Sequence, residues 1–186
     1  MQTEKQRLRA HYLEIRSGIP PGEYAAKSAA IRERILSWDL MQTIQTVHLY
    51  LAIRERNEVD THPLIPEFLS RGLQVAVPVI QPGHQLKHVT INPNTIFREG
   101  RWSVMEPANG TEITPDALDL ILVPMVAGDA AKQRIGYGKG FYDRFLEQTQ
   151  AVKAGLLFEC TRFSGYFPSE SHDHPLDVLI TEQARY

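Results

Sequence analysis

The stretch "TVHLYLAIRERNEVDTHPLIPEFLSRGLQVAVPVI", residues 46–80, decides the fold class of this chain. Residues 46–53 are rich in β-branched and aromatic side chains and have the length of a buried strand, and residues 73–80 form a second such run. Between them, Asp60 or Thr61 is a candidate N-cap for a short helix. A strand, a helix and a strand in so short a span match a right-handed βαβ unit, so the sequence predicts a parallel sheet.

The same alternation continues on both sides of this unit. Amphipathic patterns predict helices at residues 4–16 and about 23–38, and another helix begins near Phe141. Further strands are expected at 84–91, 118–127, 152–158 and 178–181, whereas residues 92–115 are expected to form mostly turns. The prediction is a single α/β domain over residues 1–186, a three-layer sandwich with a mostly parallel central sheet.

Composition restricts the classes of partner. The chain has 186 residues, one cysteine (Cys160), and 20 Lys plus Arg against 22 Asp plus Glu. One cysteine forms no internal disulfide and fits a reducing compartment, so we expect a cytoplasmic protein. The balanced charge predicts no nucleic-acid partner, and no apolar run approaches the ~20 residues needed to cross a membrane. We expect a monomer that holds any anionic ligand with a local cluster of cations.

A second stretch, "RIGYGKGFYDRF" at residues 134–145, supplies such a cluster. It lacks the glycine spacing of the dinucleotide fingerprint and of the P-loop. It follows a predicted strand and leads into a helix, and ligands of open parallel sheets lie at that end of the strands. Its glycines allow phosphate to approach the main chain, and Arg134 and Lys139 add positive charge. Asp143, in the first helical turn, is a candidate ligand for a phosphate-bound Mg2+.

A plainer interpretation of this run stays open from the spacing alone. The glycines would then make a tight turn, Arg134 and Lys139 would be solvated, and Asp143 would only favour the start of a helix.

Several segments together resemble a known family. They are "KQRLR" at residues 5–9, "NEVDT" at 57–61, "EP" at 106–107 and "LILVPMVAGDAAKQRIGYGKGFYDRFL" at 120–146. In this order they resemble the 5-formyltetrahydrofolate cyclo-ligases, over essentially the whole chain. The resemblance implies a fold related to sugar-phosphate isomerases and CoA transferases. It also implies conversion of 5-formyltetrahydrofolate and ATP into 5,10-methenyltetrahydrofolate, ADP and phosphate, with Mg2+.

The resemblance also implies roles for individual residues. Ile53 and Glu58 match folate-contacting positions, and Asp143 and Asp177 match magnesium-associated positions. Lys139 and Arg134 are the catalytic candidates, because cations would neutralise the charge on a transferred phosphoryl group. Contacts with ATP are implied for Lys5, Arg9, Arg134, Gly136, Tyr137, Gly138, Lys139, Gly140, Phe141 and Tyr142.

The chain departs from the family pattern at two positions. Gly128 replaces a usual phenylalanine, which predicts a gap in an apolar wall near the site. Phe141 replaces a frequent tyrosine, which removes a hydroxyl close to the reacting groups.

Chemistry gives the charged residues distinct tasks. Phosphoryl transfer requires alignment and charge stabilisation, which Lys139, Arg134 and Mg2+ would supply. A Glu58 carboxylate would accept two parallel hydrogen bonds from the amino and ring N–H groups of a pterin. Against this, Glu58 could be a solvated loop residue, and Lys5 and Arg9 an ordinary solvated stripe. An isomerase or CoA transferase of the same fold and a non-catalytic folate-binding protein are the rival functions.

Overall fold

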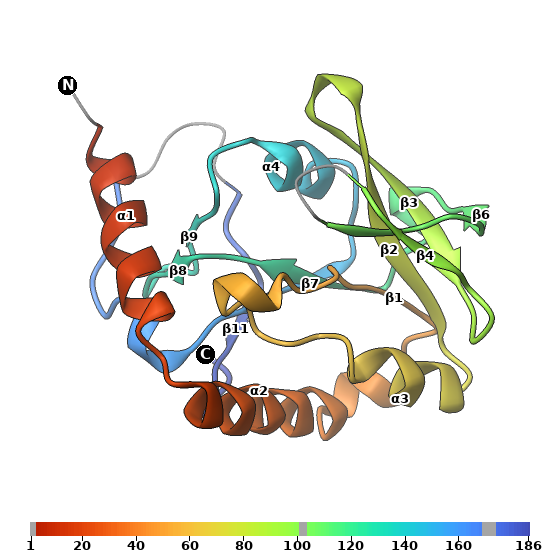
Figure 1. The fold of residues 1–186 in the computed structure, drawn as a ribbon, viewed down its shortest axis with the longest axis horizontal. Helices are drawn as coiled ribbons and strands as arrows, with labels where there is room; N and C mark the ends of the chain where they lie inside the picture. Colours follow the sequence, from red (N-terminus) through yellow and green to blue (C-terminus); the bar gives the residue numbers. More distant parts are fainter. Residues whose placement is uncertain (1–2, 101–103, 169–173) are drawn as a thin grey trace.

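A seven-stranded sheet is the centre of the computed structural model, which describes residues 3–100, 104–168 and 174–186 (Figure 1). The strand order is β11-β10-β7-β1-β2-β3-β6. The strands are β1 (Thr46–His48), β2 (Gln74–Gln81), β3 (Gln85–Ile91), β6 (Thr111–Glu112), β7 (Leu120–Pro124), β10 (Val152–Leu156) and β11 (Val178–Ile180). Neighbours from β11 to β2 pair in parallel, and β3 and β6 add antiparallel pairings. The predicted mostly parallel sheet is confirmed.

Helices cover the sheet, and two small hairpins lie beside it. The helices are α1 (Glu4–Ser17), α2 (Pro21–Leu36), α3 (Leu64–Ser70) and α4 (Phe141–Leu146). Short 3-10 turns are η1 (Asp39–Gln42), η2 (Arg54–Arg56), η3 (Pro82–His84), η5 (Pro115–Ala117) and η6 (Glu159–Thr161). One hairpin pairs β4 (Phe97–Glu99) with β5 (Met105–Pro107), and the other pairs β8 (Ala127–Gly128) with β9 (Arg134–Ile135).

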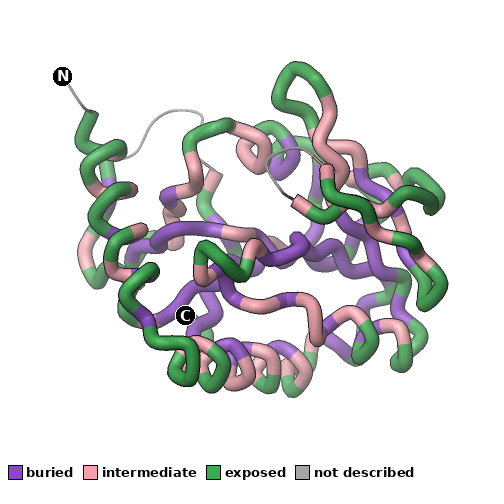
Figure 2. The backbone as a smooth tube through the Cα atoms, viewed as in Figure 1, coloured by how far each residue is buried: buried purple, intermediate pink, exposed green. Residues whose placement is uncertain are grey.

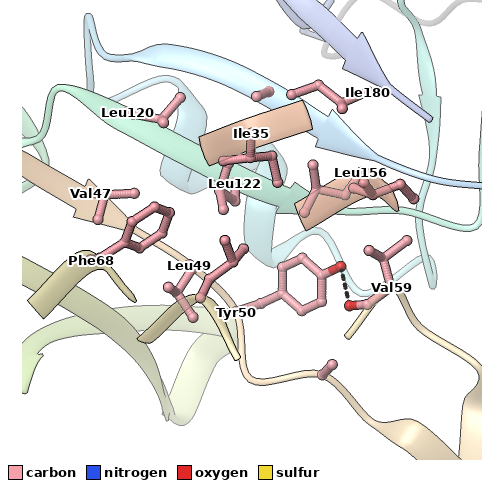
Figure 3. Close-up of a cluster of buried hydrophobic side chains, with 14 of the residues drawn as sticks. Ile35, Val47, Leu49, Tyr50, Val59, Phe68, Leu120, Leu122, Leu156 and Ile180 are labelled. Carbon is pink, nitrogen blue, oxygen red and sulfur yellow. Dashed lines mark hydrogen bonds between the residues drawn. The ribbon is translucent and has the colours of Figure 1, made fainter. Parts of the chain in front are cut away.

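Two apolar layers, one on each face of the sheet, form most of the core, and a third, smaller cluster includes Tyr12 of α1 and Ile135 of β9. Along β7, Leu120 and Leu122 belong to the cluster that contains Ile35 of α2, as Figure 3 shows. The alternate residue Ile121 belongs to the other cluster, which contains Phe145 of α4. Strands that are buried on both faces require apolar side chains at successive positions, and Figure 2 shows that much of the central strands is buried. The predicted three layers are therefore present.

Three local predictions were wrong or incomplete. Strand β1 ends at His48 rather than at residue 53, because the following chain leaves the sheet. Neither Asp60 nor Thr61 caps α3, whose N-cap is Pro63. Instead the Thr61 hydroxyl donates to the carbonyl of Tyr50 at 2.5 Å, which fixes the chain after β1. Residues 92–115, expected to be mostly turns, contribute β4, β5 and β6.

Candidate functional site

A cleft of about 990 Å³ lies at the carboxyl ends of β1, β2 and β7. This volume reaches the upper end of the range for small-molecule sites, about 300–1,000 Å³, and is large enough for extended ligands. Its wall includes residues from the start of α1, the chain after β1, the ends of β2 and β7, the loop before α4 and α4 itself. The predicted site residues on this wall are Lys5, Arg9, Ile53, Glu58, Arg134, Gly136, Tyr137, Gly138, Lys139, Gly140, Phe141, Tyr142 and Asp143.

Helix α1 carries two of the cations. Its first turn is fixed by a capping box, in which the Thr3 hydroxyl accepts from the amide of Gln6 and the Gln6 side chain accepts from the amide of Thr3. Lys5 and Arg9 follow on the cleft side, and Nε of Arg9 donates to the carbonyl of Gly136 at 2.6 Å. The two residues are therefore part of the cleft and are not simply a solvated helix stripe.

The glycine loop depends on the absence of side chains at Gly138. This residue has φ of 78°, and a Cβ atom placed there would lie 2.9 Å from the guanidinium carbon of Arg9. The backbone conformation therefore favours glycine, and a side chain at this position would also displace the Arg9 guanidinium. Gly140, with φ of 70°, is the N-cap of α4. A Cβ at Gly136 would meet nothing within 4 Å, so that position leaves open space in the loop.

Arg134 and Asp143 form an ion pair across this loop. The Arg134 side chain is 6% exposed and the Asp143 side chain is 32% exposed. The solvated interpretation of Arg134 is thus wrong, whereas Lys139 is exposed on the cleft wall as that interpretation expected.

Glu58 is 5% exposed, so it is not a solvated loop residue. One carboxylate oxygen, Oε2, accepts from the amide of Ile53 at 2.8 Å. The other, Oε1, accepts from the Tyr137 hydroxyl at 2.5 Å. Burial, and after it the negative charge of Glu58, raises the pKa of Tyr137 to about 12, so this hydroxyl keeps its proton and donates. The buried carboxylate therefore has a fixed orientation at the cleft wall.

Tyr142 has a buried hydroxyl that has no hydrogen-bond partner among the described residues. Burial, followed by the charge of Glu58, raises the pKa of this hydroxyl, which therefore stays protonated. A buried donor without a partner is costly, about 1–3 kcal/mol, unless something else binds it. Tyr142 is also one of the residues that line the cleft.

The two predicted magnesium residues are not brought together. Asp143 lies at the cleft, but Asp177 precedes β11 and is not among the described residues that line the cleft. Its Oδ2 accepts from the amide of Lys153 near the amino end of β10. Within the described ranges, no three His, Cys, Asp or Glu side chains gather as a metal site. Asp143 alone still fits Mg2+ that arrives with phosphates, because that ion commonly binds one or two carboxylates and keeps its other ligands.

Gly128 does not leave the gap that was expected in an apolar wall of the site. Gly128 is buried, and a Cβ there would lie 2.7 Å from Cε of Met125 and 3.0 Å from a methyl of Leu179. It packs in the core and is absent from the described cleft wall, so the predicted gap at the site is wrong. Phe141 does line the cleft, with its ring centroid 5.4 Å from that of His84.

Sequence reasoning missed the part that Arg16 plays. This residue is 3% exposed on α1, and its Nη2 donates to the Tyr137 hydroxyl at 2.5 Å. The signal was present, because Arg16 continues the basic stripe that Lys5 and Arg9 begin. Nothing in the sequence indicated that the stripe turns inward at this point.

In the described residues, no helix is long and apolar enough to cross a membrane.

Comparison with known proteins gives one consistent result. The model of the 5-formyltetrahydrofolate cyclo-ligase family matches residues 1–182. A curated 5-formyltetrahydrofolate cyclo-ligase of Haemophilus influenzae is 28% identical, over 97% of this chain and 100% of its own length. A solved 5,10-methenyltetrahydrofolate synthetase of Aquifex aeolicus has a TM-score of 0.88 and 30% identity, over 98% of this chain and 92% of that one. The synthetase of Mycoplasma pneumoniae, at 22% identity and a TM-score of 0.78 over 97% and 99% of the two chains, supports the fold.

Proposed function

The chain belongs to the 5-formyltetrahydrofolate cyclo-ligase family, and we propose that the cleft described above is its active site. The activity is the ATP-dependent cyclisation of 5-formyltetrahydrofolate to 5,10-methenyltetrahydrofolate. One observation carries the assignment of the site. A single cleft at the carboxyl ends of the parallel strands joins the cations of α1, the glycine loop and the buried carboxylate of Glu58. Cations and backbone amides suit the phosphates, and the carboxylate suits a ring with N–H donors.

The reaction explains why both halves are needed. The formyl oxygen attacks the γ-phosphorus of ATP, and ADP leaves with the electrons of the broken P–O bond. The second folate nitrogen then attacks the formyl carbon and loses its proton. Phosphate departs with the electrons of the C–O bond, which leaves the methenyl bridge. Because the substrates supply every reacting atom, the protein mainly aligns them and stabilises charge.

The nucleotide half is formed by the glycine loop and α1. Lys139 and Arg134 stabilise the charge on the transferred phosphoryl group, and Lys5 and Arg9 hold the remaining phosphates. Main-chain amides from Gly136 to Tyr142 contribute further donors. Asp143 would hold Mg2+, which when bound neutralises phosphate oxygens and so makes phosphorus easier to attack. Arg134 and Asp143, which pair with each other in this structure, would then bind phosphate and metal respectively.

The folate half is formed by Ile53 and Glu58. Each oxygen of Glu58 already accepts one hydrogen bond and has a second lone pair available. The carboxylate is therefore able to accept two parallel bonds from a pterin edge. We propose that bound substrate supplies the missing partner of the Tyr142 hydroxyl, whose surroundings include the charges of both Glu58 and Arg134. We place this hydroxyl at the junction of the two substrates.

The rival functions are not retained, because isomerases, CoA transferases and folate-storage proteins do not use ATP to close a ring. The exposed position of Cys160 and the composition fit a reducing compartment. We propose a cytoplasmic monomer that acts on the two small-molecule substrates without a nucleic-acid or membrane partner.

An assay of coupling tests the proposal. Absorbance follows the methenyl product while ADP is measured in the same reaction, with each of folate, ATP and Mg2+ omitted in turn. We expect equal amounts of ADP and methenyl product, and neither when any component is missing. ADP release at the same rate without folate would contradict the coupled mechanism.

A further inference from the structure

Arg16 is a buried charge that the proposed chemistry does not use. Its side chain is buried at the end of α1, and it is absent from the described cleft wall. Nη1 donates to the carbonyl of Met125 at 3.1 Å, and Nη2 donates to the Tyr137 hydroxyl at 2.5 Å. Nε has no partner within the described part of the chain. A guanidinium in such a position is expensive to bury unless a negative charge compensates it.

The compensating charge is Glu58, and Tyr137 connects the two. The Tyr137 hydroxyl accepts from Arg16 and donates to Oε1 of Glu58. The guanidinium carbon of Arg16 also lies 5.5 Å from the centre of the Tyr137 ring. The two hydrogen bonds therefore form a chain with one direction. The Arg16 guanidinium donates to the Tyr137 hydroxyl, which in turn donates to the Glu58 carboxylate. Such a chain fixes which lone pairs of Glu58 are occupied and which remain for a ligand.

The backbone around Glu58 is tied to the same end of α1. Asn57, the residue before it, has φ of 49° and donates from its side-chain amide to the carbonyls of Arg16 and Ile19, at 3.1 and 3.2 Å. The first bond satisfies a carbonyl in the last turn of α1, and the second a carbonyl just beyond the helix. The end of α1 therefore positions the Glu58 segment twice, through its main chain by Asn57 and through its side chain by Arg16.

We propose that Arg16 is a positioning residue for the reaction, which acts through Tyr137 to orient the Glu58 carboxylate toward the pterin edge of the folate substrate. This inference rests on the proposed folate role of Glu58. It assigns the side chain of Tyr137 to the folate half, whereas its main chain belongs to the glycine loop of the nucleotide half. Arg16 itself touches neither substrate.

The test is a double-mutant cycle on folate affinity. Arg16→Met, Tyr137→Phe and the double variant are titrated separately with 5-formyltetrahydrofolate and with ATP. We expect each single change to weaken folate binding about tenfold, the loss that corresponds to one hydrogen bond, with ATP affinity altered less than about twofold. Because Arg16 acts through Tyr137, the double variant should be scarcely weaker than Tyr137→Phe alone. In kinetics the same variants should raise KM for folate more than they lower kcat.

Two controls separate this effect from simple loss of structure. Arg7→Met removes an exposed arginine from the same helix and should leave folate affinity unchanged. Arg16→Lys keeps the charge without the guanidinium fork and should recover part of the affinity lost in Arg16→Met. Losses that add fully in the double variant, or that fall equally on folate and ATP, would overturn the inference. Folding is checked in every variant by circular dichroism.

Failure of the inference is distinguishable from failure of the proposed function. If Glu58→Gln leaves folate affinity unchanged, the folate role of Glu58 is wrong whatever Arg16 does. If Glu58→Gln weakens folate binding and Arg16→Met does not, only the positioning role of Arg16 is wrong.

Discussion

The Tyr137 hydroxyl donates a 2.5 Å hydrogen bond to Oε1 of Glu58, and so joins the glycine loop to the segment that follows β1. These residues are 79 positions apart in the chain. The contact lies at the meeting point of the two proposed substrate sites. A cyclo-ligase must bring the formyl oxygen of folate to the γ-phosphate of ATP, so a rigid junction here serves alignment.

Replacing Asp143 by Asn should raise the magnesium concentration needed for half-maximal turnover, because the change removes the negative charge that we assign to the metal. Asp177→Ala should leave that requirement at the wild-type value. It should instead reduce the free energy of unfolding by about 1 kcal/mol, since Oδ2 of Asp177 accepts from the amide of Lys153. Turnover measured across a magnesium titration checks both variants. If Asp177→Ala also raised the magnesium concentration needed for half-maximal turnover, Asp177 would act with the metal, as the family resemblance implies, and the assignment from its position in the fold would be wrong.

Removal of the Tyr142 hydroxyl should affect catalysis but not folding. Among the residues that the structure describes, this buried hydroxyl has no partner, so Tyr142→Phe should leave the melting temperature unchanged or raise it. If the hydroxyl meets substrate, kcat/KM for folate should fall about tenfold or more. Steady-state kinetics and thermal unfolding are measured on the same preparation. Wild-type kinetics together with a lowered melting temperature would show that the hydroxyl has a purely structural role.

A buried pair of histidines predicts how stability depends on pH. Nδ1 of His88 and Nε2 of His48 lie 3.1 Å apart in the core. Burial lowers the pKa of His88 from 6.5 to about 4, although the charge of Glu112 opposes this, and burial followed by His88 lowers the pKa of His48 well below its ordinary value. Between about pH 4 and 6.5 the unfolded chain therefore binds more protons than the folded protein. Acidification through this range should favour unfolding, by roughly 1.4 kcal/mol per pH unit for each histidine.

Urea unfolding at several pH values between 4.5 and 7 measures this slope. His88→Gln retains hydrogen-bonding groups beside His48 but does not titrate. The slope of its unfolding free energy against pH should therefore be smaller than the wild-type slope by the contribution of one proton. A variant with the wild-type slope would show that other groups cause the acid sensitivity.

The elements of the fold were largely predictable because their patterns are local. Strand β10 and the βαβ unit follow from apolar runs and helical spacing, and the glycine loop follows from its composition. Strand β1 was predicted too long because residues 49–53 keep the apolar character of a strand. Of these residues, Tyr50, Leu51 and Ile53 line the cleft. The Tyr50 hydroxyl donates to the carbonyl of Val59, as Figure 3 shows.

The site was predictable only where chemistry alone suggested a role. Lys139 and Asp143 belong to a recognisable loop, whereas the pairing of Arg134 with Asp143 and of Tyr137 with Glu58 depends on tertiary structure. In the sequence, Arg16 looks like one more member of a solvated basic helix stripe, and only the fold shows that it is buried. Asp177 is the opposite case. The family resemblance implied that it belongs to the magnesium site, but in the fold it lies outside the described cleft wall.

The central claim is that two substrates occupy opposite halves of one cleft, and crossed titration calorimetry tests it most directly. Glu58→Gln replaces an acceptor by a donor, which should cost about 1–3 kcal/mol and weaken folate binding roughly ten- to hundredfold while ATP affinity hardly changes. Lys139→Ala should weaken ATP binding and turnover while folate binding persists, because it withdraws one cation from the phosphates. Lys153→Ala, outside the described cleft wall, is the matched control and should change neither. If Glu58→Gln weakens ATP as much as folate, or if Lys139→Ala keeps wild-type ATP affinity and turnover, the division of the cleft is wrong.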